Sequence, residues 1–515
     1  MNSLQLNELL ALIDNAELVG DPNISFNRII SNSRECEPRD LFIAIQGEHF
    51  DGHDYLKEVA EKGAAAALVV TNHKNISTSL ALPLIKVKDT RQALGQLATR
   101  WRQKFSLPVV AVIGSNGKTT VKEMIHSIFK AEVGERNSVA SFGNFNNDLG
   151  VPFSLLKLCS QHRLAVFEVG MNHIGETAAL IKMVAPTILL INNAQREHQE
   201  FMESVEKVAQ EHASAIYLLK DDAKIVIPAD DHFTPLWHEA AGQRSVIKFN
   251  LKPAAVSIDD LSIERQTLSD SKQVNAFFQP CPQKQHQMIK VNLDNEWVKF
   301  VLPMVGQHSA KNAVAAIACA RFAQVSTKAI IEGLSYFQPV VGRLKQLVVQ
   351  YDEIKGAQLI DDSYNANPDS VRAAIDILKA CPGRKVLVFG DMGEMGIQAY
   401  SAHREIGEYA YSQGIDALLT FGRESLVTWQ TFNALSLKSS DDVHSHDQHS
   451  TTKTLIEKGG HFLDQNDLIR SLNQMFIKYK WNEQTNTILV KGSKSMSMKN
   501  IVSKLAAPVL NQCEK

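Results

Sequence analysis

The stretch VVAVIGSNGKTTVKEMIHSIF, from Val109 to Phe129, indicates the fold class of this chain. A β-rich run leads into a loop with two glycines, and a segment compatible with a helix follows directly. In this order of elements, backbone N–H groups of the loop and the N-terminus of the helix face phosphate oxygens. The sequence therefore predicts an α/β protein with a nucleotide-phosphate site at this loop.

The residue types in the loop fit that role. Gly114 and Gly117 allow a tight turn, Lys118 would reach the β- and γ-phosphates, and the Thr119 hydroxyl would join a Mg²⁺ shell. The spacing differs from the common G-x-x-x-x-G-K-[ST] pattern, because Val112 stands where that pattern has its first glycine. A glycine turn with a surface lysine is the alternative, but the strand before it and the helix after it favour nucleotide binding. The predicted nucleotide contacts here are Gly114, Ser115, Asn116, Gly117, Lys118, Thr119 and Thr120.

Further β-rich runs alternate with helical segments, which predicts parallel sheets in α/β units. Glu168 ends one run and should project from the carboxyl edge of the sheet, where α/β proteins bind ligands and where a carboxylate suits Mg²⁺. His198 follows the next run at the same relative place. A solvated carboxylate and a structural histidine are the alternatives for these two residues. The runs are Leu107–Ile113, Leu164–Val169, Thr187–Asn192, Lys385–Gly390 and Thr487–Gly492.

The chain length of 515 residues predicts more than one domain. We divide it into 1–105, 106–340 and 341–515, with the phosphate loop in the second block. Two polar stretches, 269–287 and 436–452, are expected to be loops. The second contains three histidines, but Ser and Asp surround them, which favours a solvated loop over a metal site. These histidines are His444, His446 and His449.

The composition excludes several classes of protein. The chain is 44% hydrophobic and 21% charged, with 54 basic and 56 acidic side chains, as in ordinary globular proteins. A net charge of −2 gives no overall field for nucleic acid. The six cysteines stand far apart, which favours a reduced, cytoplasmic protein over structural zinc. The N-terminus is expected to form an amphipathic helix and not a signal peptide, and no apolar run is long enough to span a membrane.

Along essentially its whole length the chain resembles the Mur ligase family, the ATP-dependent amide-forming enzymes of peptidoglycan precursor synthesis. DDSYNANP is the most specific of the matching motifs, because other members of the family carry a histidine-containing variant there. The motifs are Ser33-Arg34, Gly47 and Asp51-Gly52-His53, then GSNGKTT, GNFNND (143–148), FEVGMNHIGE and INNAQREH, then GQHSAKNAVAA (306–316), DDSYNANPDS (361–370), GDMGEMG (390–396) and KGSKSM (491–496).

The resemblance implies a three-domain architecture, with a central P-loop domain built on a parallel sheet and a Rossmann-like C-terminal domain. It also implies that ATP and Mg²⁺ are used to join D-alanyl-D-alanine to UDP-N-acetylmuramoyl-tripeptide through an acyl phosphate. We expect a cytoplasmic monomer without a nucleic-acid partner. A ligase of the same superfamily that adds another amino acid or glutamate is the nearest alternative. A regulatory P-loop NTPase is a more distant one, and it leaves the first and third blocks unexplained.

The resemblance also implies roles for individual residues. Lys118, Glu168 and His198 would be catalytic, and Thr119, Glu168 and His198 would hold the metal. Asn312 would face the adenine, Asp362 the ribose or triphosphate, and Arg343 the phosphates once the domains close. The implied substrate contacts are Ser33, Arg34, Asp51, Gly52, His53, Asn144, Asn146, Asn365, Asn367 and Lys491. A turn before Pro368 is the alternative for Asn367, and a solvated cation for Lys491.

Two positions depart from the family pattern. The family places a carbamylated lysine about fourteen residues after the histidine matched by His198, and an ungapped count ends at His212. Glu211 or His212 would complete the metal shell in its place, unless the carbamate's role is absent. Ser309 stands where an asparagine is usual.

Overall fold

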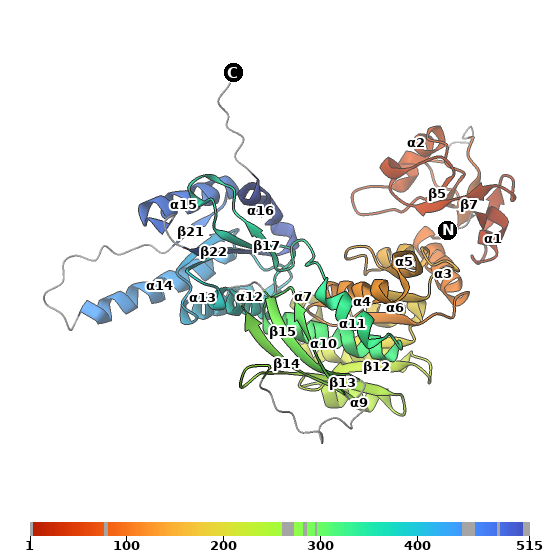
Figure 1. Ribbon diagram of the computed structural model, residues 1–515. Helices are drawn as coiled ribbons and strands as arrows, with labels where there is room; N and C mark the ends of the chain where they lie inside the picture. The colour runs from red at the N-terminus through yellow and green to blue at the C-terminus, as the bar shows by residue number, and fades with distance from the viewer. Residues whose placement is uncertain are drawn as a thin grey trace.

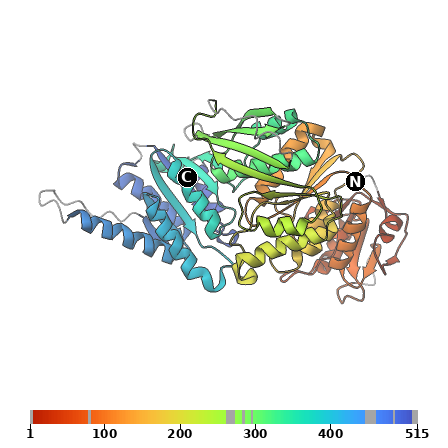
Figure 2. The same cartoon turned by 90° about the horizontal axis from the view of Figure 1, so that it is seen from below.

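The computed structural model describes residues 4–76, 81–259, 272–281, 286–293, 296–444, 459–481 and 485–507. These residues form sheets of two, five, nine and six strands. The three larger sheets carry helices and follow one another from the red N-terminal end to the blue C-terminal end (Figures 1 and 2). Strands and helices alternate along the chain, so the predicted α/β class is confirmed.

The N-terminal sheet is parallel except at one edge, where β2 runs antiparallel to β7. Its order is β2 (Glu17–Val19), β7 (Leu84–Val87), β6 (Ala66–Val70), β5 (Asp40–Ile43) and β4 (Arg28–Ile30). Beside it lie α1 (Leu6–Leu10), α2 (Leu56–Glu61) and the pair β1 (Leu4–Gln5) and β3 (Ser25–Phe26). The predicted N-terminal helix is therefore a short one, because the chain leaves it to form β2 at the edge of the sheet.

The central sheet has nine strands, and seven of them form a parallel run that includes the strand before the phosphate loop. Its order is β16 (Glu296–Leu302), β15 (His286–Leu293), β14 (Gln273–Cys281), β13 (Val246–Pro253), β12 (Lys224–Pro228), β11 (Ile188–Ile191), β8 (Val109–Ile113), β10 (Leu164–Glu168) and β9 (Ser138–Ala140). β14 is parallel to β13, and β15 is antiparallel to both of its neighbours, β14 and β16.

The loop predicted over 269–287 is wrong for its described part, because Gln273–Cys281 is β14 and His286 begins β15. Val274, Ala276 and Phe278 alternate into the core, while the residues between them are partly exposed. Pro280 lies beyond the last β13–β14 pair, which is Pro253 with Phe278, so its missing N–H costs no bond to β13.

Helices cover both faces of the central sheet, and β8 shows how the two cores are divided. Val110 and Val112 pack with one group of helices, while the residues that alternate with them pack with the other. The first group is α4 (Lys118–Val133), α10 (Gln307–Phe322) and α11 (Thr327–Ser335). The second is α3 (Thr90–Gln103), α5 (Gly150–Leu155), α6 (Glu176–Val184), α8 (Val205–Tyr217) and α9 (Thr234–Ala241).

The C-terminal sheet is parallel except for its edge strand β17. Its order is β17 (Lys345–Val348), β18 (Gln358–Asp362), β22 (Asn486–Lys491), β19 (Arg384–Gly390), β20 (Ala417–Phe421) and β21 (Gly459–Phe462). Its helices are α12 (Pro368–Ala380), α13 (Ala399–Ser412), α14 (Ser425–His444), α15 (Gln465–Lys478) and α16 (Lys499–Ala506).

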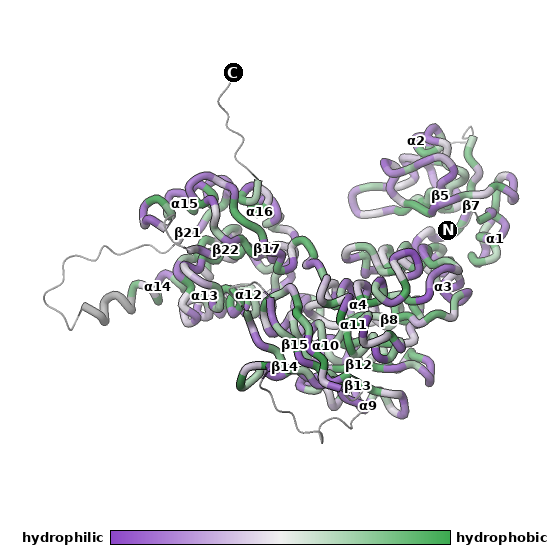
Figure 3. Tube along the Cα trace, in the orientation of Figure 1, coloured by the Kyte–Doolittle hydropathy of each residue, from purple (hydrophilic) through white to green (hydrophobic). Residues whose placement is uncertain are grey.

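The loop predicted over 436–452 is corrected in part. Backbone of its first residues continues α14 as far as His444, while His446 and His449 lie outside the described residues. Hydrophilic and hydrophobic residues alternate along the coloured part of the trace (Figure 3). Among the described residues, no helix has the length and hydropathy of a membrane span.

The chain passes between sheets at two connections. The first connection leads from α3 into the central sheet. Nε1 of Trp101 on this helix donates to the carbonyl of Leu158 (3.1 Å), and Nε of Arg102 donates to the carbonyl of Val184 (2.9 Å). This helix, which our division places in the first block, therefore packs on the central one. The chain enters the C-terminal sheet at β17, after α11. The limits at 105 and 340 stay a proposed division.

Candidate active site

A cavity of about 1390 Å³ lies between the central and C-terminal blocks. Its floor is the carboxyl edge of the central sheet, where β8, β10 and β11 end side by side. Most of the sequence-predicted site residues line it, although they come from both blocks. These are Ser115, Asn116, Gly117, Lys118, Thr119, Thr120, Asn144, Asn146, Glu168, His198, Asn312, Arg343, Asp362, Asn365, Asn367 and Lys491.

The phosphate loop connects β8 to α4, with Gly117 at the helix N-cap in a left-handed conformation (φ 81°). A Cβ there would lie 2.7 Å from Oδ1 of Asn312, so only glycine fits. Gly114 belongs to the loop but does not line the cavity. Lys118 Nζ donates to the carbonyls of Gly114 and Ser115 and to Oε2 of Glu197 (3.1 Å). The loop thus presents a helix N-terminus and an ammonium group to the cavity. Both carry positive potential, which favours binding of phosphates.

Thr119 and Glu168, two of the predicted metal ligands, are in contact. The Thr119 hydroxyl donates to Oε2 of Glu168 (2.7 Å), and Nδ2 of Asn146 donates to Oε1 of the same carboxylate (2.7 Å). Glu168 is 2% exposed and Thr119 also 2%. Arg343 crosses from the C-terminal block, and its Nη2 donates to the Thr119 hydroxyl (2.7 Å). These buried oxygen atoms are the ligand type that Mg²⁺ prefers.

His198 contacts other carboxylates. Its Nδ1 lies 2.5 Å from Oε2 of Glu394, a residue of the C-terminal block, and its Nε2 lies 4.0 Å from Oε2 of Glu197. The hydrogen bond to His198 lowers the pKa of the Glu394 carboxyl. His198 therefore forms a contact between blocks in this conformation. The sequence did not single out Glu394, although it lies within the GDMGEMG motif.

Residues of the C-terminal block form the opposite wall of the cavity. Lys491 Nζ donates to Oδ2 of Asp362 (2.5 Å) and to the carbonyl of Asn365 (3.0 Å), so it is not a solvated cation. Burial raises the pKa of the Asp362 carboxyl, and the charge of Lys491 opposes that rise. Asn367 caps α12 by accepting from the N–H of Ser370 (2.9 Å), and its Nδ2 donates to Oδ1 of Asn116 (2.9 Å). Asn367 thus combines a structural role with a contact to the phosphate loop.

A charged cluster joins the two blocks beside the cavity. Arg196 of the central block binds Asp369 on α12 (2.7 Å) and Glu405 on α13 (2.6 Å). Its backbone N–H also donates to Oδ2 of Asp369 (2.9 Å). The sequence offered no signal for this pairing, because the partners lie far apart in the chain. The cluster holds the C-terminal block over the phosphate loop.

His212, at the departure from the family pattern, lies on α8 and is 1% exposed. Burial lowers its pKa to about 4, while the charge of Glu197 acts in the opposite sense. The imidazole is therefore neutral near pH 7. Its neighbour Glu211 is turned away from the cavity, and its Oε1 accepts from the N–H of Thr177 (3.0 Å) on α6. Ser309, the second departure, is 1% exposed on α10.

The residues predicted in the N-terminal block do not line the cavity. Ser33 is 7% exposed and belongs to a 3₁₀ turn, Ser33–Glu35, that also carries the exposed Arg34. Asp51 caps a second turn by accepting from the N–H of His53 (3.0 Å). A Cβ on Gly52 would lie 2.7 Å from the backbone nitrogen of Ile45. Asp51, Gly52 and His53 thus determine the conformation of their own loop. Of the five predicted substrate contacts in this block, Arg34 is the exposed one.

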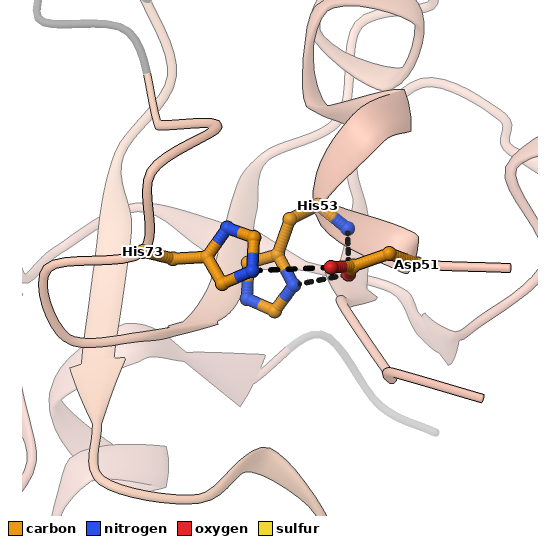
Figure 4. Close-up of side chains that lie close together, drawn as sticks. All are labelled: Asp51, His53 and His73. Atoms are coloured by element: carbon orange, nitrogen blue, oxygen red, sulfur yellow. Dashed lines mark hydrogen bonds and ion pairs between the residues drawn. The ribbon is translucent and has the colours of Figure 1, made fainter. Parts of the chain in front are cut away.

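Asp51, His53 and His73 lie close enough to suggest a metal site, but their hydrogen bonds exclude it (Figure 4). Nε2 of His53 accepts from the N–H of Val70 (3.0 Å), so the proton of a neutral ring sits on Nδ1, which donates to Asp51 (2.6 Å). Nδ1 of His73 likewise accepts from the N–H of Asn75 (3.3 Å), which leaves its Nε2 to donate to Asp51 (3.1 Å). The nitrogens facing Asp51 therefore carry protons. The group is a hydrogen-bonded cluster, which the sequence did not predict.

Comparison with known proteins adds independent evidence. Three family models match the chain: the Mur ligase family catalytic domain at residues 25–102, the Mur ligase middle domain at 112–320, and the Mur ligase glutamate ligase domain at 342–494. The chain is 32% identical over 497 residues to a UDP-N-acetylmuramoyl-tripeptide–D-alanyl-D-alanine ligase from Haemophilus influenzae, covering 96% of this chain and 97% of the relative. It is 34% identical over 505 residues to the Escherichia coli protein of that name, covering 98% and 99%. A crystal structure of MurF from Acinetobacter baumannii, 27% identical, superposes with a TM-score of 0.81 over 98% of this chain and 99% of that one.

Proposed function

The chain belongs to the Mur ligase family, and on that premise we propose that it joins D-alanyl-D-alanine to UDP-N-acetylmuramoyl-tripeptide while ATP is converted to ADP and phosphate. The observation that carries the proposal is the near-complete similarity to ligases of that name. The product is UDP-N-acetylmuramoyl-pentapeptide, a precursor of peptidoglycan. We place the reaction in the cytoplasm, in agreement with the scattered cysteines.

The chemistry must activate a carboxylate, which is a poor electrophile at neutral pH. The terminal carboxylate of the tripeptide attacks the γ-phosphorus of ATP, the bond to ADP breaks, and an acyl phosphate forms. The amine of D-alanyl-D-alanine then attacks the acyl carbon. The tetrahedral intermediate collapses to the amide as the bond to phosphate breaks, and the proton lost by the amine ends on the released phosphate.

Phosphoryl transfer depends mainly on positioning and on neutralising the charge of the transferring group. In this proposal the N–H groups of the phosphate loop and the Lys118 ammonium bind the β- and γ-phosphates. Lys118 exchanges its contacts with the Gly114 and Ser115 carbonyls for phosphate oxygens. Arg343, which already reaches the Thr119 hydroxyl, adds a second positive charge from the C-terminal block. Asn312 would lie on the adenine side and Asp362 near the ribose or triphosphate.

Mg²⁺ fits the pair Thr119 and Glu168, because both offer buried oxygen atoms to the cavity. When bound, Mg²⁺ would neutralise phosphate charge and polarise the γ-phosphoryl group. His198 stays a predicted ligand. It would exchange its contact with Glu394 for the metal.

The two substrates would contact different blocks of the chain. The N-terminal block would hold the uridine nucleotide, with Arg34 exposed for that contact. Asn144 and Asn146 would hold the sugar or peptide of the nucleotide substrate near the phosphate loop. Asn365, Asn367 and Lys491 would contact the incoming dipeptide from the C-terminal wall.

The Arg196 cluster gives a prediction about closure of the two blocks. Arg196→Ala removes the side chain that binds both Asp369 and Glu405. Because the C-terminal block must stay over the phosphate loop, we expect kcat/KM for ATP to fall roughly 10-fold. Steady-state kinetics with ATP as the varied substrate measure the change.

Arg372→Ala is the matched control for this substitution. Arg372 also binds Glu405 (3.1 Å), but both residues belong to the C-terminal block. An equal loss in both variants would refute the role of Arg196 in closure.

The proposed amine substrate is tested by product analysis. The full-length chain is incubated with ATP, Mg²⁺, UDP-N-acetylmuramoyl-tripeptide and, in separate reactions, D-alanyl-D-alanine, D-alanine or D-glutamate. Mass spectrometry should detect the pentapeptide product, and only in the first reaction. A product made from a single amino acid would instead identify the chain as another ligase of the superfamily.

A further inference from the structure

Glu197 is a buried carboxylate in the cavity that none of the assigned roles uses. It lies between β11 and α7 (Gln199–Met202), directly before His198, and it is 5% exposed. Its Oε2 accepts from Lys118 Nζ (3.1 Å). Its Oε1 has no hydrogen-bond partner among the described residues. A buried carboxylate oxygen without a partner is costly, so this atom points to a missing ligand.

His212 lies beside the unpartnered oxygen. Its Nε2 is 3.9 Å from Oε1 of Glu197, and its Nδ1 also lacks a hydrogen-bond partner in the described structure. His198 Nε2 lies 4.0 Å from the other oxygen of Glu197. The carboxylate therefore stands between two imidazoles at separations too long for hydrogen bonds. Two atoms that bind one metal ion, each at about 2.0–2.3 Å from it, lie at most about 4.6 Å apart, so both separations leave room for an ion between the groups.

The charge of Glu197 leads to the same conclusion. Lys118 is the phosphate-loop lysine, so a bound triphosphate brings anionic oxygens close to the Glu197 carboxylate. Two anions next to one ammonium group repel each other in a buried site. A divalent cation between the carboxylate and the γ-phosphate would remove this repulsion.

We propose that Glu197 is a ligand of a second divalent cation at the phosphate end of the cavity, separate from the ion held by Thr119 and Glu168. His212 lines the far side of this carboxylate, at the position where the family pattern expects a carbamylated lysine. An imidazole at position 212 cannot provide the negative charge of a carbamate. Glu197, in the loop before α7, provides that charge instead. The proposal rests on the proposed function, because the second ion would bind together with the triphosphate.

Binding of Mn²⁺ tests this assignment without relying on turnover. The full-length chain is saturated with AMP-PCP, an ATP analogue that cannot transfer its γ-phosphate, and bound Mn²⁺ is counted from the electron paramagnetic resonance signal of free Mn²⁺. We expect about two ions per wild-type chain. In Glu197→Gln the affinity for one ion should fall at least about 10- to 100-fold while the other is unchanged.

Two further variants make the result specific. Glu197→Asp keeps a carboxylate and should retain the second ion with intermediate affinity. Glu203→Gln, which removes an exposed carboxylate that pairs with Lys207, should bind both ions like the wild type. Thermal unfolding of each variant shows that the chain is folded.

The outcomes separate the possible failures. If Glu197 only pairs with Lys118, the glutamine variant keeps both ions at wild-type affinity, and the proposal is wrong. A single ion in the wild type also overturns it. Failure of AMP-PCP to bind the wild-type chain contradicts the proposed function itself, not only the role of Glu197.

Discussion

The Lys118→Ala variant should form ADP at least about 1000-fold more slowly than the wild-type chain. Lys118 is the ammonium group that the phosphate loop directs into the cavity, and its present partners are two loop carbonyls and Glu197. Its loss leaves the transferring phosphoryl group without that charge and leaves Glu197 without its cation. Rapid-quench measurement of ADP with saturating substrates gives the rate.

Two controls separate this loss from misfolding. Lys130→Ala removes an exposed lysine from the same helix, α4, and should leave the rate unchanged. Binding of the UDP substrate to Lys118→Ala should stay near normal, since Lys118 lies in the central block, away from the uridine side. A Lys118→Ala variant that still consumes ATP would show that the phosphate loop has been wrongly assigned.

Glu168→Gln is expected to lower turnover about 100-fold or more, because a neutral amide binds Mg²⁺ far less strongly than a carboxylate. Glu168 is held by Thr119 and Asn146 at the end of β10, so the isosteric amide keeps the shape of the site. The variant should also need more Mg²⁺ for half-maximal activity. Titration of activity with Mg²⁺ measures both effects.

Glu176→Gln is the matched control for this substitution. Glu176 lines the same cavity at the start of α6, but its carboxylate binds the N–H of Asn172 and contacts His173. We expect the Mg²⁺ dependence of this variant to match the wild type. An unchanged Mg²⁺ requirement in Glu168→Gln would remove Glu168 from the metal site.

The local pattern of the sequence predicted the elements that carry the phosphate loop and Glu168, the proposed Mg²⁺ ligand. β8, the loop and α4 depend mainly on residues that are close together in the chain. The β-rich run, the two glycines and the helix-compatible segment within residues 109–129 were therefore enough to predict them. Glu168 could be placed because parallel strands end at one edge of a sheet. The same reasoning placed His198 near that edge, although its contact with Glu394 was not foreseen.

The polar composition of residues 269–287 led to a wrong loop prediction, because contacts with neighbouring strands determine the structure of this stretch. β14 alternates buried Val274, Ala276 and Phe278 with polar residues, and its neighbours β13 and β15 satisfy its backbone. Its polar residues Gln273, Asn275 and Gln279 are partly exposed, and such residues resembled a loop in the sequence. The short period-2 alternation was present in the sequence and was the better signal.

The remaining site residues depend on contacts between distant parts of the chain. Arg196 meets Asp369 and Glu405 only after the C-terminal block docks. Glu197 precedes His198 in the sequence, but its burial beside Lys118 and His212 follows from the packing of α8 against the loop. A single sequence carries no direct signal for such pairs.

Release of ADP in the presence and absence of each co-substrate tests the central claim most directly. The account predicts rapid ADP formation only when UDP-N-acetylmuramoyl-tripeptide and D-alanyl-D-alanine are both present, with one pentapeptide formed for each ADP. Steady ATP hydrolysis that is indifferent to both co-substrates would contradict it and would indicate a nucleotide hydrolase without ligase activity.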